Sequence, residues 1–162
     1  MSTLSTVTIY TDGACRGNPG PGGYGIVLMA GAARKELSAG YRRTTNNRME
    51  LLALIKGLEA LKRPCRAEIY SDSQYVLAAF QKKWIARWKA NGWQTTAKKP
   101  VQNQDLWMAL DLALAAHTPV FHWVKGHASN PENNRCDELA TTAARGSSLQ
   151  VDAGYEAAQV LV

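Results

Sequence analysis

The chain has 162 residues, 46% of them hydrophobic and 20% charged, which predicts one globular domain that buries roughly two-thirds of its unfolded surface. No apolar run approaches the ~18 residues of a membrane span, no signal peptide is recognisable, and the three cysteines are too far apart for a disulfide framework, so we expect a cytoplasmic protein with free thiols. The net charge of +6 suits a polyanionic partner.

The chain begins with a predicted strand over residues 7–12, where apolar and polar side chains alternate as far as Asp12. The Gly- and Pro-rich residues 13–25 predict a long loop. Within it, Gly20 to Gly25 match the dinucleotide fingerprint G-x-G-x-x-G. That fingerprint requires a helix to follow, whereas Ile26 to Gly31 have the composition of a strand. We therefore reject a dinucleotide site and expect a meander whose third strand spans about 33–41.

A core-facing helix is predicted after this meander, because apolar residues recur at i, i+3, i+4 and i+7 from Leu51 towards Lys62, before Pro64. Glu50 lies on the flank of the apolar stripe, where a carboxylate is held close to whatever the helix packs on. An alternative interpretation is that Asn47 to Glu50 form a capping box, with the glutamate merely closing the first turn.

The second half of the chain predicts a strand over 66–71, ending at Asp72, and a helix from Ser73 to about 81. A basic segment continues to about 92 and a polar loop covers 94–100. A helix is expected over 103–117 and a last strand over 119–125. After a loop at 126–129, Asn130-Pro131 signals the start of a helix to Arg145. Residues 1–145 thus predict a single α/β domain with one mixed sheet, and 146–162 a loosely attached tail.

The basic segment carries no acidic residue between Asp72 and Asp105. Trp84 and Trp88 are spaced to share one helix face, which favours capture of phosphates with apolar contact to sugars or bases. A solvated basic face that rests on core tryptophans would show the same pattern. The six cations of the segment are Lys82, Lys83, Arg87, Lys89, Lys98 and Lys99.

Four carboxylates lie at predicted element ends or helix faces: Asp12, Glu50, Asp72 and Asp137. Each has a structural alternative as a turn, cap or surface residue. If the first and fourth strands are neighbours, however, both strand-end aspartates converge beside the helix of Glu50. Such crowding favours bound cations, and oxygen ligands suit Mg²⁺ or Mn²⁺ better than zinc.

Five motifs carry a family resemblance, in chain order TDGACRGNPGPGGYG, TTNNRMELLA, YSDSQYV, the basic tryptophan segment and WVKGHASNPENNRCDELA. Together they make residues 7–145 similar to bacterial type 1 ribonuclease H, and the similarity continues weakly at Gly154-Tyr155. The resemblance implies a mixed five-stranded sheet of order 3-2-1-4-5 with helices on both faces. It also implies endonucleolytic hydrolysis of the RNA strand of RNA–DNA hybrids, leaving 3′-hydroxyl and 5′-phosphate ends.

The resemblance assigns roles residue by residue. It implies that Asp12, Glu50, Asp72 and Asp137 hold two Mg²⁺ ions, which Mn²⁺ can replace, and that His127 assists proton movement or product departure. The resemblance also implies that the protein is a monomer, that it binds the hybrid and that it does not associate with a membrane. Ala90-Asn91 and one apparent insertion before Trp84 depart from the family pattern of the basic protrusion. The implied contacts to the hybrid are Asn18, Thr45, Asn46, Gln74, Lys82, Lys83, Trp84, Arg87, Trp88 and Lys89.

Two competing functions remain at the level of sequence. Another metal nuclease of the same superfamily would also cluster carboxylates, but the amides at Asn18, Asn46 and Gln74 favour the hybrid, since amide side chains can bond 2′-hydroxyls. A catalytically idle hybrid-binding module would gain from fewer negative charges facing phosphate, so the full set of four carboxylates speaks against it.

Overall fold

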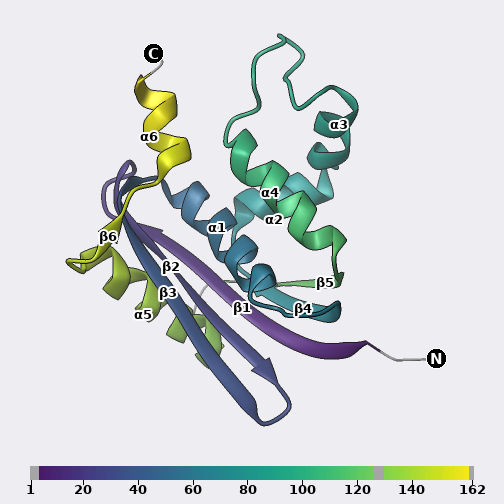
Figure 1. The fold of residues 1–162 in the computed structure, drawn as a ribbon, viewed down its shortest axis with the longest axis vertical. Coiled ribbons are helices and arrows are strands. Elements are labelled where there is room, and N and C mark those ends of the chain that lie inside the picture. The colour runs from purple at the N-terminus through teal and green to yellow at the C-terminus, as the bar shows by residue number, and fades with distance from the viewer. Residues whose placement is uncertain (1–3, 126–129, 161–162) are drawn as a thin grey trace.

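A single mixed sheet forms the centre of the protein. The computed structural model describes residues 4–125 and 130–160, and places six strands in the order β5-β4-β1-β2-β3-β6 (Figure 1). β1, β2 and β3 are antiparallel neighbours, whereas β4 runs parallel to β1, and β5 parallel to β4. The predicted order 3-2-1-4-5 is confirmed, and β6 adds a short strand beside β3. The bounds are β1 Ser5–Cys15, β2 Gly20–Ala30, β3 Ala33–Thr44, β4 Cys65–Ser71, β5 Thr118–Trp123 and β6 Leu149–Gln150.

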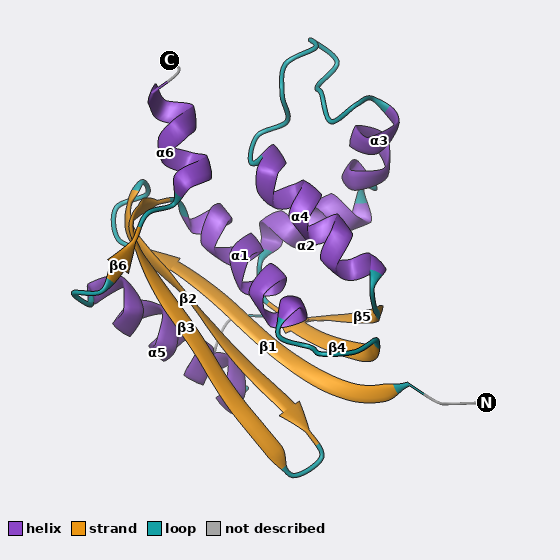
Figure 2. Cartoon of the chain, viewed as in Figure 1, coloured by secondary structure: helices purple, strands orange, loops and turns teal. Residues whose placement is uncertain are grey.

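Helices cover both faces of the sheet, as predicted (Figure 2). Neighbouring residues of β2 show the two layers, since Ile26 packs near Gly57 of α1 and Gly25 lies against the backbone of Cys136 in α5. None of the helices within the described residues is long and apolar enough to cross a membrane. The bounds are α1 Asn46–Glu59, α2 Gln74–Gln81, α3 Trp84–Ala90, α4 Gln104–Ala115, α5 Pro131–Arg145 and α6 Ala153–Val160.

The Gly-rich segment differs from the long loop that we predicted. β1 continues to Cys15 and β2 already begins at Gly20, so only four residues connect them. The glycines serve packing here, because a Cβ at Gly23 would overlap the carbonyl oxygen of Ala140, and one at Gly25 that of Cys136. Glycine therefore lets α5 lie close on the sheet. The rejection of a dinucleotide site is confirmed, since a strand and not a helix follows Gly20.

Residues 146–160 also differ from the loose tail that we expected. β6 pairs with Gly40 and Tyr41 of β3, and Asp152, which is 7% exposed, accepts hydrogen bonds from the buried guanidinium of Arg48 at 2.8 and 2.9 Å. Arg42 binds Glu156 of α6 through a bidentate ion pair. The C-terminal segment is thus docked on β3 and on the start of α1.

Candidate active site

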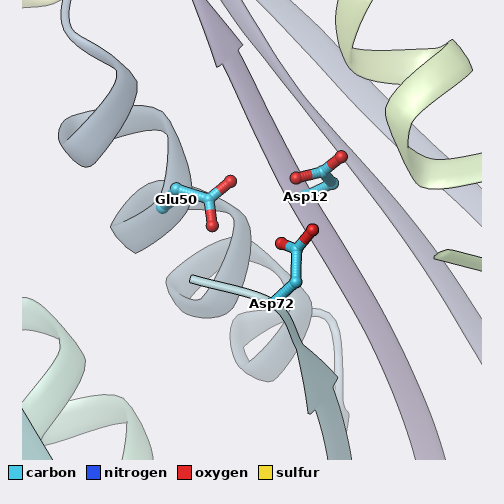
Figure 3. A group of neighbouring side chains, drawn as sticks. All are labelled: Asp12, Glu50 and Asp72. Atoms are coloured by element: carbon cyan, nitrogen blue, oxygen red, sulfur yellow. The ribbon is translucent and has the colours of Figure 1, made fainter. Parts of the chain in front are cut away.

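Three carboxylates meet beside β1, at the C-terminal end of β4 (Figure 3). Asp12 comes from β1, Glu50 from α1, and Asp72 follows β4. Each offers one oxygen, and these oxygens lie within 4.8 Å of one another. Asp12 and Glu50 are only 5% and 6% exposed. The convergence predicted from the two strand ends is therefore present.

Glu50 is held by β1 and not by its own helix. α1 begins at Asn46, and its N-cap is Thr45, whose side chain accepts from the N–H of Arg48 at 3.2 Å. The alternative of a capping box from Asn47 to Glu50 is therefore wrong. Instead the N–H of Gly13 donates to the Glu50 carboxylate, and also to Asp12 Oδ1 at 2.9 Å.

Gly13 is a functional position that the sequence prediction missed. A Cβ there would overlap the backbone of Met49 and Glu50, so glycine permits the close contact between β1 and the first turns of α1. The Asp-Gly pair was interpreted as a possible turn. Its partner, 37 residues further along the chain, has no local signal in the sequence.

Asp72 and Asp137 complete the acidic wall of a cleft of about 400 Å³. The N-cap of α2 is Ser73, which accepts from the N–H of Val76, so Asp72 is not the capping residue. Asp137 projects from α5 and lines the same cleft, outside the close set of three. Asn46, Asn47, Ser73, Gln74 and Tyr75 line the cleft beside the carboxylates.

The electrostatics of the cleft favour a bound cation. The pKa of Asp12 is raised to about 7, chiefly by burial and also by the charges of Asp72 and Asp137, against the opposing effect of hydrogen bonds with Glu50 and the Gly13 N–H. Burial and the neighbouring Asp12 raise the pKa of Glu50 well above its usual value. Cations between these groups would favour their charged forms. The donors are all carboxylate oxygens, the ligands that hard divalent ions prefer, so the cluster can bind a metal ion.

The other predicted contact residues lie around the start of α1 and α2. Asn18 Oδ1 accepts from the backbone N–H of Asn46 at 2.9 Å and so docks the β1–β2 connection on α1. The side chains of Asn46 and Gln74 are exposed at the cleft. Thr45 uses its hydroxyl to cap α1. His127 belongs to the loop 126–129, which lies outside the described residues.

The basic segment has exposed cations around tryptophans that rest on the core, while its capture of phosphates stays a prediction. Trp84 and Trp88 face each other with ring centroids 5.8 Å apart, and both are partly buried against the core; the ring of Trp88 also contacts the buried Trp107. The cations surround them at the surface, with Lys82 Nζ 5.5 Å from the centre of a Trp84 ring. α3 and the following loop line a surface hollow of about 740 Å³. We call residues 82–99 the basic arm.

His117 and His122 make structural contacts. His117 Nδ1 accepts from the N–H of Cys65 at 3.1 Å, and His122 Nε2 lies 2.8 Å from Glu68 while its ring stacks on Tyr70. Neither lines the acidic cleft.

Fold and site together define the class of protein. Buried carboxylates at the edge of a mixed sheet, beside a basic arm, are the arrangement of an α/β nuclease that uses metal ions. The RNase H family model matches residues 5–145. The chain belongs to the ribonuclease H family, and it is an enzyme of that family.

The relatives and solved structures agree with this assignment. The chain is 56% identical over 151 residues to a Ribonuclease H of Desulforamulus reducens, covering 93% of this chain and 95% of the relative. It is 59% identical over 149 residues to one of Syntrophus aciditrophicus, covering 92% and 86%. The structure of LC9-RNase H1 superimposes with a TM-score of 0.80 at 30% identity, covering 97% and 82%. LC11-RNase H1 in complex with an RNA/DNA hybrid gives 0.64 at 28% identity, covering 85% and 96%.

Proposed function

We propose that this protein hydrolyses the RNA strand of RNA–DNA hybrids as an endonuclease and leaves 3′-hydroxyl and 5′-phosphate ends. The observation that carries the proposal is the set of three carboxylates within 4.8 Å of one another, in a chain of the ribonuclease H family. The hybrid bound by LC11-RNase H1 supports the choice of substrate.

Two Mg²⁺ ions, for which Mn²⁺ can substitute, would be held by the four carboxylates. When bound, such ions activate water and neutralise charge at a phosphodiester. Asp12 lies beside Glu50 and Asp72 and would help to hold both ions. Asp72 and Glu50 would hold the first ion, and Asp137 would hold the second. Gly13 orients Asp12 and Glu50 through its N–H. His127 would assist proton movement or product departure.

Different residues of the protein would contact the RNA strand and the DNA strand of the hybrid. The amides of Asn18, Asn46 and Gln74 are suited to bond 2′-hydroxyls in the shallow minor groove of the hybrid. Thr45 would lie at a phosphate of the DNA strand while its hydroxyl caps α1. The basic arm would grip the DNA strand through Lys82, Lys83, Arg87 and Lys89, with Trp84 and Trp88 supplying an apolar surface. Three free cysteines suit action in the cytoplasm, and we infer a monomer.

A cleavage assay tests the proposal. Labelled RNA–DNA hybrid, duplex RNA, duplex DNA and single-stranded RNA are incubated with the protein in Mg²⁺, in Mn²⁺ and with a chelator. We expect cleavage of the RNA strand of the hybrid alone, lost on chelation. Binding of the hybrid without cleavage would favour the idle binding module, and cleavage of duplex DNA would favour another nuclease of the superfamily.

A further inference from the structure

The walls of the acidic cleft are the starts of two helices. α1 contributes Asn46 and Glu50, and α2 contributes Gln74 and Tyr75. α1 packs far more extensively against α4 than against α2. α2 packs only weakly against either α1 or α4, so side-chain bonds that join both helices to the start of α4 can contribute to the separation of Asn46 from Gln74.

Both attachments are made at the start of α4. On the α1 side, Arg48 binds the Asp105 carboxylate through Nη1 at 2.8 Å and Nη2 at 2.7 Å, and Nη1 also donates to Asn103 Oδ1 at 3.4 Å. On the α2 side, the Tyr75 hydroxyl accepts from Asn103 Nδ2 at 3.2 Å and from Trp107 Nε1 at 2.9 Å. Asn103 is the one side chain among these that contacts both Arg48 and Tyr75.

The backbone of Asn103 marks it as unusual. It is the N-cap of α4, yet it has left-handed torsions, φ 60° and ψ 29°, and within the described residues its side chain makes no capping bond to α4. Asparagine at an N-cap ordinarily accepts from the second or third N–H of the helix. Here the amide is directed away from α4, and both of its ends bond to neighbouring helices. The side chain therefore serves the spacing of the helices more than the capping of its own.

We propose that Asn103 is a positioning residue that sets the distance between the 2′-hydroxyl contacts on the two walls, Asn46 and Gln74, by holding Arg48 and Tyr75 at fixed places on α4. The inference rests on the proposed function, because it assigns Gln74 to the recognition of the RNA strand. It concerns binding of the hybrid and not the chemical step. Asp12 lies within β1, Asp72 directly follows β4 and Glu50 is tied to Gly13, so none of these attachments passes through Asn103.

Asn103→Gly is the direct test, since glycine adopts the left-handed backbone without strain and removes only the side chain. We expect KM for the hybrid to rise about three- to tenfold, the range for loss of about one net hydrogen bond, with kcat changed less than about twofold. Tyr75→Phe removes the hydroxyl that accepts the hydrogen bond from Asn103, and it should also raise KM. Gln102→Gly is the matched control. It adds a glycine at the neighbouring exposed position and should leave KM unchanged.

A double-mutant cycle with Gln74→Ala separates positioning from a general loss of structure. If Asn103 acts through Gln74, Asn103→Gly should change KM less than about twofold when Gln74 is already alanine. A variant that is merely partly unfolded would instead lose kcat equally in both backgrounds, and melting temperatures measured alongside identify that case.

The outcomes distinguish this inference from the proposed function. A wild-type protein that fails to cleave the hybrid would overturn the proposed function itself. A wild-type protein that cleaves it, while Asn103→Gly and Tyr75→Phe keep the wild-type KM, would overturn only the role of Asn103. Full additivity with Gln74→Ala would overturn it as well.

Discussion

Replacement of Asp152 by alanine should destabilise the whole domain, although this residue lies in the C-terminal segment. Its carboxylate accepts from Arg48 Nε at 2.8 Å, Arg48 Nη2 at 2.9 Å, the Thr44 hydroxyl at 2.6 Å and the N–H of Tyr155 at 3.3 Å. Arg48 is 3% exposed and Thr44 is fully buried. The substitution leaves a buried guanidinium with one of its two carboxylate partners and a buried hydroxyl without an acceptor.

The expected magnitude follows from these two losses. Removing one partner of a buried ion pair costs about 3–5 kcal/mol, and leaving a buried polar group without a partner about 1–3 kcal/mol. Asp105 remains bound to Arg48 and reduces the first cost. We therefore expect the free energy of unfolding to fall by about 4 kcal/mol, and the melting temperature to fall by roughly 10 °C for a domain of this size.

Urea unfolding followed by tryptophan fluorescence and circular dichroism measures the loss. Arg42→Ala is the control, because it removes an exposed ion pair to Glu156 of the same C-terminal segment and should leave stability nearly unchanged. A decrease below about 1 kcal/mol for Asp152→Ala would refute the reasoning and restore the expectation of a loosely attached tail. An equal loss in both variants would show that docking of α6, and not the buried network, is what stabilises the domain.

Three further substitutions test the site. Asp12→Asn should abolish metal-dependent cleavage and raise the melting temperature of the metal-free protein at pH 7 and above. An unfolded aspartate loses its proton near pH 4 and folded Asp12 near pH 7, so the wild type loses stability as the pH rises between these values. The difference in melting temperature between variant and wild type should therefore vanish below pH 4. His127→Ala should lower kcat more than it raises KM with little change in melting temperature, and an unchanged kcat with a large thermal loss would make this histidine structural. The last change neutralises four cations of the basic arm together: Lys82, Lys83, Arg87 and Lys89. It should weaken hybrid binding and flatten the salt dependence of binding, while the rate of single-turnover cleavage at saturating enzyme is retained.

The parts of the fold that the sequence predicted are those with a local periodic signal. The apolar spacing after Glu50 places α1, and Asn130-Pro131 marks the start of α5, which Asn130 caps at 3.2 Å. The glycines of β1 and β2 misled the prediction, because strand propensity penalises glycine wherever it stands. In this protein Gly23 and Gly25 are needed for the approach of α5, a requirement set by a helix more than 100 residues further along the chain.

The same distinction separates the predictable from the unpredictable part of the candidate site. Asp12 lies in β1 just beyond its last pairing with β4, and Asp72 directly follows β4, so once β1 and β4 are neighbours their convergence follows from topology. Glu50 could be placed near them from the helix pattern, but its bond to Gly13 could not. The roles of Asn103 and Asp152 could not be predicted, because no local sequence pattern indicates the left-handed backbone of Asn103 or the ion pair of Asp152 with Arg48. The positions of the site carboxylates thus follow from strand order, whereas the contacts that we propose to set the width of the cleft are long-range polar ones. Substitutions at the carboxylates should therefore change turnover, and substitutions in the polar network should change substrate fit and stability.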